Sequence, residues 1–205
     1  LVSPITSNPV YGQGQEPRDG LEGHSRISVV HGDVVIQPST SGNTLEAMQN
    51  MPIMTGDRLA AGEDGAVEFN LGNGNCGWIW FESKLEFSEL SINGNGDQVS
   101  DMRLWYGALA LRSGNPGHVN QQVSVSDQNL SVVLGADSLV RFTMDSNLTS
   151  FYITVIQGSA TLLVDGREDI IRPNESANVL IGSGVYNRIP ALRSDDFDEW
   201  YQERD

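Results

Sequence analysis

Apolar residues alternate with other residues along most of this chain, and one alternating pattern occurs three times. Each copy reads apolar-x-apolar-x-x-Gly-x-apolar-x-apolar, with period two on both sides of one glycine. Period two is typical of a half-buried β-strand, and a glycine between two such arms is typical of a tight turn. The pattern therefore predicts three copies of a β-hairpin, at residues 26–37, 102–113 and 151–166.

Shorter apolar or alternating segments occupy the chain between these copies. The Gly-Asn-Gly-Asn run at 72–75 favours a hairpin turn between two of them. No connection is long enough for a crossover helix. We therefore expect an all-β chain of many short antiparallel strands. The further strands are expected at 65–71, 77–81, 83–90, 123–125, 130–134, 139–144, 169–171 and 177–181.

The end of the chain has a different period. Phe197, Trp200 and Tyr201 follow the spacing i, i+3, i+4, which places them on one face of a helix. Acidic residues precede them, as suits a helix N-terminus, and Ser194 is a candidate cap. We expect a short C-terminal helix that docks by its aromatic face, and these three aromatic residues are also candidates for contact with a partner.

The charge of the chain narrows the classes of partner. The 205 residues carry 27 acidic and 12 basic side chains, which gives a formal net charge of −15. Nucleic acids and anionic membrane surfaces attract basic patches, so we expect neither as a direct ligand, and membrane association only through partners. The single cysteine, Cys76, excludes an intrachain disulfide and a multi-thiolate metal site.

The sequence shows no motif that is typical of a catalytic site. The three histidines are isolated from one another, and no nucleotide-binding or nucleophile motif occurs. Acidic groups at 82–89 and 195–198 leave open a carbohydrate-active protein with paired carboxylates. Acidic turns at 62–65 and 93–97 favour turn chemistry over calcium binding. We expect no catalytic residue, cofactor or metal. Glycosylation sequons lie at Asn129, Asn147 and Asn174.

The first 25 residues have a distinct composition, rich in proline and glycine and poor in large apolar side chains. Such an arm cannot form its own core, so we expect it to lie extended along a neighbouring subunit or a sheet edge. The expected organisation is an arm at 1–25, a β domain at 26–190 and a helical tail at 191–205. The apolar residues with which the arm could contact a partner are Leu1, Val2, Ile5, Val10 and Tyr11.

The order of the strand motifs resembles the FecR-like domain family. The motifs that carry the resemblance are VVHGDV at 29–34, GDRL at 56–59, LWYGAL at 104–109 and VIQGSATL at 155–162. The ending DDFDEW at 195–200, followed by RD at 204–205, is similar to the ending of one branch of these proteins. The match covers about residues 26–181.

The resemblance implies an exported β domain, periplasmic or extracellular, with a twisted solenoid-like or sandwich-like arrangement and a leader that has been removed. It supplies no catalytic residue. The name-giving members relay an iron-uptake signal from an outer-membrane receptor to a sigma factor, and their cytoplasmic segment and membrane helix are not in this sequence. The matched turn residues are Gly32, Gly56, Asp57, Gly107 and Gly158.

Two functions from different classes follow. The first is a non-enzymatic structural or protein-binding subunit of a homo- or hetero-oligomeric envelope or extracellular assembly. The alternative is a regulatory or sensing domain of FecR type in cell-surface signalling.

Overall fold

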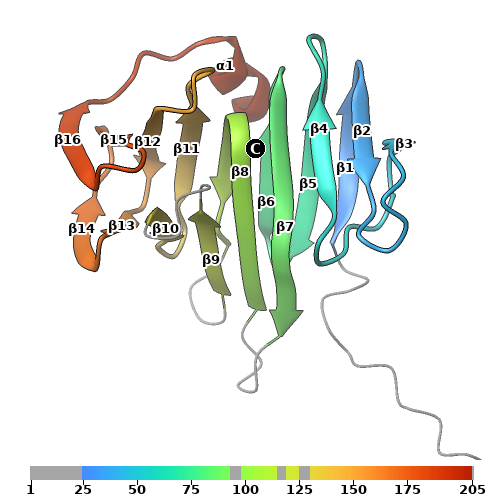
Figure 1. Ribbon diagram of the computed structural model, residues 1–205, viewed down its shortest axis with the longest axis horizontal. Coiled ribbons are helices and arrows are strands. Elements are labelled where there is room, and N and C mark those ends of the chain that lie inside the picture. The colour runs from blue at the N-terminus through green and yellow to red at the C-terminus, as the bar shows by residue number, and fades with distance from the viewer. Residues whose placement is uncertain (1–24, 93–97, 115–118, 125–129, 205) are drawn as a thin grey trace, which may run out of the picture.

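Two β-sheets packed face to face make up the protein in a computed structural model, which describes residues 25–92, 98–114, 119–124 and 130–204 (Figure 1). All paired strands are antiparallel except β8 and β9, which are parallel. Sheet A has the order β1 (Arg26–His31), β5 (Ala66–Gly72), β6 (Asn75–Ile79), the second part of β8 (Gln98–Arg112), β11 (Leu139–Met144), β12 (Ser150–Gln157), β15 (Glu175–Leu180) and β16 (Val185–Pro190). Sheet B has the order β3 (Leu45–Glu46), β2 (Val34–Gln37), β4 (Arg58–Ala61), β7 (Ser83–Ile92), the first part of β8, β9 (Val119–Ser124), β10 (Leu130–Leu134), β13 (Ala160–Val164) and β14 (Arg167–Ile171).

The three repeated glycine patterns are corners between the sheets, and the prediction that they are hairpins is wrong. β1 pairs with β5 in sheet A, whereas β2 pairs with β3 and β4 in sheet B. β12 and β13 are divided between the sheets in the same way. In β8 the residues before Gly107 pair with β7, and the residues after it pair with β6 and β11.

The spacing of the apolar residues explains why a corner forms. Leu104 and Leu109 are five residues apart, as are Val155 and Ala160, and all four are buried in one core. An odd spacing along a single strand would place the two side chains on opposite faces. Passing to the opposite sheet turns the second side chain back toward the core. The alternation in the sequence shows each strand but not the sheet to which it belongs.

A repeated contact holds each corner. The amide of Ala108 donates to the hydroxyl of Ser83 at 2.8 Å, and the amide of Ser159 donates to the hydroxyl of Ser138 at 2.9 Å. At the first corner the amide of Asp33 donates to the carboxylate of Asp64 at 3.2 Å. The glycine before each donor has a positive φ, a conformation open to glycine at little steric cost. These angles are +62° at Gly32, +90° at Gly107 and +72° at Gly158.

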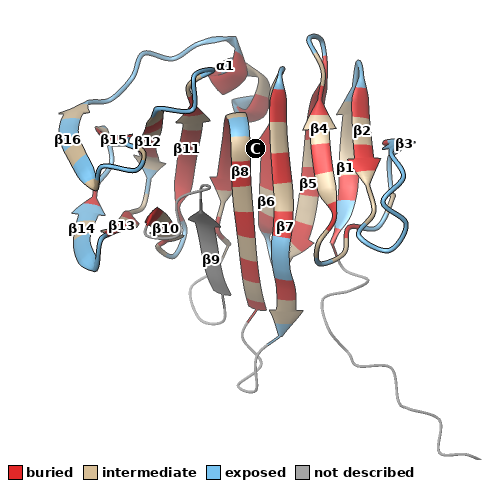
Figure 2. Ribbon diagram, in the orientation of Figure 1, coloured by how far each residue is buried: buried red, intermediate tan, exposed pale blue. Residues whose placement is uncertain are grey.

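The main hydrophobic core lies between the sheets, where alternating strand residues are buried (Figure 2). Phe69 from sheet A and Phe87 from sheet B meet there edge to face, with ring centroids 5.1 Å apart. The predicted hairpin at 72–75 is confirmed, because β5 and β6 pair through it. Positive φ angles at Asn73 and Gly74 suit this kind of turn. The short strands β3 and β4 and the largely exposed β16 have no counterpart among the predicted strands.

A second apolar cluster lies on the outer face of sheet A under helix α1 (Asp196–Gln202). Phe197 and Tyr201 are buried there against Trp78 of β6. The helix is capped by Asp195 and not by Ser194, because the Asp195 carboxylate accepts the amides of residues 197 and 198 in a capping box. Within the described part of the chain no helix is long and apolar enough to span a membrane.

Candidate protein-binding site

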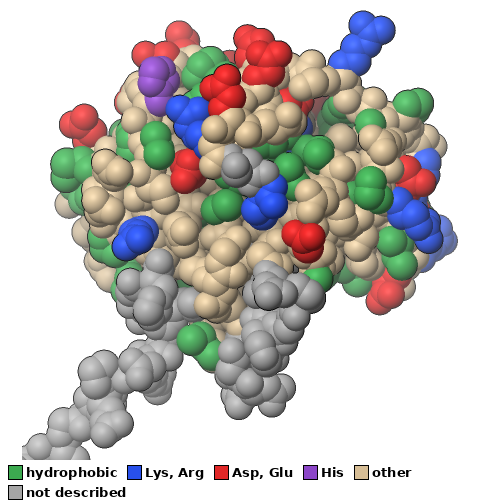
Figure 3. Space-filling model, turned by 180° about the vertical axis from the view of Figure 1, so that it is seen from behind, with side chains coloured by type: hydrophobic (Ala, Val, Ile, Leu, Met, Phe, Trp, Pro, Cys, Tyr) green, Lys and Arg blue, Asp and Glu red, His purple; other side chains and the backbone are tan. Residues whose placement is uncertain are grey.

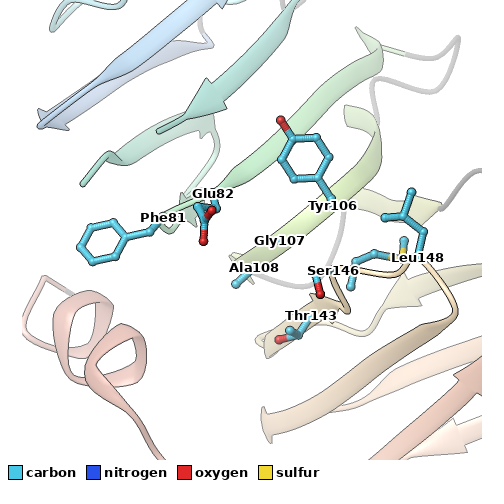
Figure 4. Close-up of a pocket in the computed structure, with 9 residues that line it drawn as sticks. Phe81, Glu82, Tyr106, Gly107, Ala108, Thr143, Ser146 and Leu148 are labelled. Carbon is cyan, nitrogen blue, oxygen red and sulfur yellow. The ribbon is translucent and has the colours of Figure 1, made fainter. Parts of the chain in front are cut away.

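A groove of about 420 Å³ opens beside the corner at Gly107. Its walls come from the chain before β7, from the corner itself and from the turn between β11 and β12 (Figure 4). Phe81 lies at the end nearest the helix, whereas Tyr106 and Leu148 lie toward the opposite end. Ala108 lies between these ends, and Met144 also lines the groove. The groove is therefore largely apolar, with Glu82 as its carboxylate.

Two large apolar side chains of this groove are open to solvent. Tyr106 is 39% exposed and Leu148 is 47% exposed. Single exposed apolar residues are common on protein surfaces and need no explanation. Two that line the same largely apolar groove are instead typical of a binding surface.

Leu148 has a backbone conformation that leucine rarely adopts. Its φ is +57°, in the left-handed region, and its amide donates to the carbonyl of Asp145 at 2.9 Å. For a side chain with a Cβ, this conformation costs roughly 1–2 kcal/mol. Because the side chain is exposed, little burial offsets the cost. Strain of this kind is a reason to look for a function at that residue.

Hydrogen bonds accepted by the Asp145 carboxylate hold this turn. The carboxylate accepts the amides of Ser150 at 2.9 Å and Thr149 at 2.6 Å, and the Thr149 hydroxyl at 2.7 Å. These bonds, above all the one from Ser150, hold the pKa of Asp145 below its usual value. The backbone of the turn is therefore held in this conformation at neutral pH, where Asp145 is ionised.

Changing Leu148 to asparagine is expected to raise the free energy of unfolding by about 0.5–1 kcal/mol, because asparagine accepts the left-handed conformation more readily. Urea unfolding would measure the change. The same substitution at Leu180, which is exposed but has no positive φ, is the matched control and should give no gain. A loss of stability in Leu148→Asn would show that the leucine stabilises the turn and is not strained.

Three of the carboxylates singled out in the sequence are engaged away from the groove. Glu86 accepts hydrogen bonds from Arg58 at 2.9 Å and from the indole of Trp105 at 3.1 Å. Asp195 and Asp198 both accept hydrogen bonds from Arg141. Glu82 faces the groove without a second acidic residue or a histidine among the lining residues. The groove itself therefore offers no acid–base pair.

The remaining candidate groups are the possible metal ligands, the thiol of Cys76 and the three sequon asparagines. Among the described residues, no three His, Cys, Asp or Glu side chains are close enough together to hold a metal ion. Burial raises the pKa of the Cys76 thiol to about 11, although Arg112 acts in the opposite direction. The thiol is therefore protonated at neutral pH. The exposed Asn147 and Asn174 both lie in turns, and Asn129 lies outside the described residues.

The predicted turn residues lie at sharp changes of chain direction. Besides the three corner glycines, Gly56 has a φ of +86°. The buried Asp57 beside it accepts the amides of Ser39 at 2.8 Å and Met54 at 2.9 Å. This carboxylate joins two segments far apart in the sequence. The GDRL motif therefore contains a carboxylate that connects two loops through hydrogen bonds.

The predicted partner contacts are only partly available. Phe197 and Tyr201 are buried within the chain's own fold, so these two side chains are not open to a partner. Trp200 is partly buried, and the Arg204 guanidinium lies 4.6 Å from its ring centroid. The apolar pattern does not mark Tyr106 or Leu148 as a binding residue, because neither the corner nor the positive φ is visible in it. Leu1, Val2, Ile5, Val10 and Tyr11 lie outside the described residues.

Together, the two sheets and the groove define a sandwich-like β domain with a surface suited to binding. No protein-family model matches the chain, and no curated protein matches it. Two crystal structures of "a putative anti-sigma factor" from Parabacteroides distasonis share the fold, with TM-scores of 0.55 and 0.53. Sequence identity is 11% and 10% over 71% and 65% of this chain. The chain spans 64% and 59% of those proteins, less than two thirds of either.

Proposed function

We propose that this chain is a non-enzymatic regulatory domain of FecR type, which binds another protein through the groove beside Gly107. The observation that carries the proposal is Leu148, an exposed leucine in the left-handed conformation at the border of an apolar groove. A protein interface would supply the burial that this side chain lacks in the domain alone. Tyr106 across the groove is of a type that often anchors interfaces.

The likeness of fold supports the regulatory part of the proposal. The solved structures that share the fold are described as those of "a putative anti-sigma factor", which is a regulator by its name. The order of the GDRL and glycine-corner motifs along this chain agrees with the FecR-like pattern. We propose the same location as for exported members of that family, the periplasm or the cell exterior.

The charge of the chain indicates what kind of segment the groove would accept. Glu82 is exposed at the groove, and the chain as a whole carries a net charge of −15. A partner segment that places an apolar side chain between Tyr106 and Leu148, with a basic residue beside Glu82, would match both the surface and the charge.

Site-specific photo-crosslinking in the cells of origin would test this proposal. A crosslinking amino acid at position 148 should give a defined protein adduct. Position 170 is the matched control, because Ile170 is 48% exposed and Leu148 is 47% exposed. The purified partner should then bind Leu148→Asn at least about tenfold more weakly, a loss of roughly 1.4 kcal/mol. Because this variant is expected to be more stable, unfolding could not explain the loss.

Equal crosslinking at positions 148 and 170, or unchanged affinity of Leu148→Asn, would contradict the groove as the binding site. The regulatory role has a separate measurement, which is the change in transcript levels when the gene is deleted and restored with Leu148→Asn. If the partner proves to be a repeating structural subunit and transcript levels do not respond, the chain is an assembly subunit and not a regulator.

A further inference from the structure

Three positively charged side chains surround one tryptophan on sheet B. The Arg103 guanidinium lies 4.3 Å from the ring centroid of Trp105, the Arg58 guanidinium 5.6 Å and the Lys84 ammonium 5.7 Å. These residues come from the adjacent strands β4, β7 and β8. We call Arg58, Lys84, Arg103 and Trp105 the Trp105 patch. It includes none of the groove residues.

The strand register explains how the patch is assembled. Arg58 is paired with Glu86 across β4 and β7, and Glu86 is paired with Arg103 across β7 and β8. On β8 the neighbours Met102 and Leu104 are buried in the core. Arg103 and Trp105, with the opposite parity, therefore lie on the outer face of the sheet. The two arginines are separated by two strand spacings, which is about 10 Å.

The charges of the patch are only partly compensated. Glu86 accepts hydrogen bonds from both Arg58 and Trp105. Within the described residues, neither Lys84 nor Arg103 forms an ion pair with a carboxylate, and the buried Nε of Arg103 has no hydrogen-bond partner. Counting Glu86, the side chains of the patch sum to +2, and the carboxylates of Glu89 and Asp101, which face each other at the next position along β7 and β8, lie beside it.

Elsewhere on the surface, acidic and basic side chains lie near one another, as on the face seen in Figure 3. With 27 acidic residues available, nearby carboxylates could pair with these two cations, as Asp195 and Asp198 do with Arg141. Instead the indole ring holds the three cations through cation–π contacts, each worth about 0.5–1 kcal/mol at an exposed site. Because the cations lie over the ring, a ligand would contact the positively charged groups before it contacts the aromatic face of Trp105.

We propose that the Trp105 patch binds an acidic segment of a partner protein. Guanidinium and ammonium groups pair well with carboxylates, and an extended segment of three or four residues spans about 10 Å. A long polyanion such as a nucleic acid would be repelled by the remaining negative charge of the chain. A short acidic peptide interacts mainly with charges within the Debye length, about 8 Å at physiological salt, and therefore with the patch itself.

The probe is a fluorescein-labelled ten-residue peptide of alternating glutamate and serine, whose binding is followed by fluorescence anisotropy. The double variant Lys84→Gln/Arg103→Gln should bind it about tenfold more weakly or worse. Arg167→Gln/Arg172→Gln is the matched control, because both arginines are exposed and both double variants change the net charge from −15 to −17 by removing two positive charges. The control variant should bind like the unaltered protein.

A second experiment tests the proposal even if the patch variant folds poorly. The same peptide with glutamine in place of glutamate should bind the unaltered protein at least about tenfold more weakly, and raising the salt to about 150 mM should weaken the glutamate peptide. Absence of binding at low salt, or equal losses in both double variants, would overturn the proposal. Tighter binding of inorganic polyphosphate than of the peptide would overturn the choice of a protein ligand.

Discussion

Replacing Gly158 by valine is expected to lower the free energy of unfolding by about 3 kcal/mol or more. Two effects add at this corner. The φ of +72° is strained for a β-branched residue, at roughly 1–2 kcal/mol. A Cβ would also lie 2.7 Å from the Cα of Ser138 and 2.8 Å from the carbonyl oxygen of Asp137, and such overpacking costs about 1–3 kcal/mol. Thermal unfolding should show a midpoint about 6–12 °C lower.

Gly166→Ala separates the two effects. Gly166 has a similar φ of +75°, but nothing lies within 4 Å of the position that a Cβ would take. This variant should lose only the conformational part, about 1 kcal/mol. If Gly158→Val melts within a degree of the unaltered protein, the corner tolerates a side chain, and the close approach to Ser138 does not constrain it.

Replacing Arg141 by alanine is expected to cost about 3–5 kcal/mol, because it removes one partner of a buried ion pair. The Arg141 guanidinium donates to Asp198 at 2.6 Å and to both oxygens of Asp195 at 2.7 Å. The variant would leave the Asp198 carboxylate buried without its cation. Because this pair fixes the start of α1, the emission of the tryptophans near the helix should shift on the loss of docking.

Arg188→Ala is the control for this prediction. Arg188 also bonds to two carboxylates, Asp169 and Glu175, but about a third of its side chain is exposed. Exposed ion pairs contribute about 0.2–1 kcal/mol each, so this variant should lose far less. A loss in Arg141→Ala no larger than that in Arg188→Ala would show that the helix does not depend on the buried pair.

The same contact predicts a pH dependence. Burial opposes ionisation of Asp195, but its hydrogen bonds and the charge of Arg141 outweigh burial, so the pKa of Asp195 lies below its usual value of 3.8. A depressed pKa contributes stability that is present above pH 3.8 and is lost as the pH falls through the lower folded-state value. In Arg141→Ala this part of the acid-induced loss of stability should be smaller.

The sequence predicts strands better than it predicts their partners. Period two marks the arms on either side of Gly107 and Gly158, because each arm has one buried face. The same alternation is compatible with a hairpin and with a corner between layers. What decides between them is the partner strand, which lies far away in the sequence. The repeated serine contact at Ser83 and Ser138 is likewise visible only in three dimensions.

For the candidate binding residues, too, the sequence predicts local structure better than it predicts tertiary contacts. The helical spacing of Phe197 and Tyr201 correctly predicts one aromatic face, but a docked helix buries that face in its own domain. Leu148 gives no signal in the sequence, because its significance lies in a backbone angle. The Trp105 patch depends on a cross-strand register that joins residues up to 47 positions apart, from Arg58 to Trp105.

Because β8 belongs to both sheets, the two layers share one uninterrupted segment of backbone. Its first part is hydrogen-bonded to β7 and β9, and its second part to β6 and β11. Separation of the layers would therefore require that β8 lose its neighbours on at least one side of Gly107. Neither layer can be exchanged or deleted as an independent module, and slow amide hydrogen exchange on both sides of the corner would report one cooperative opening of the whole sandwich.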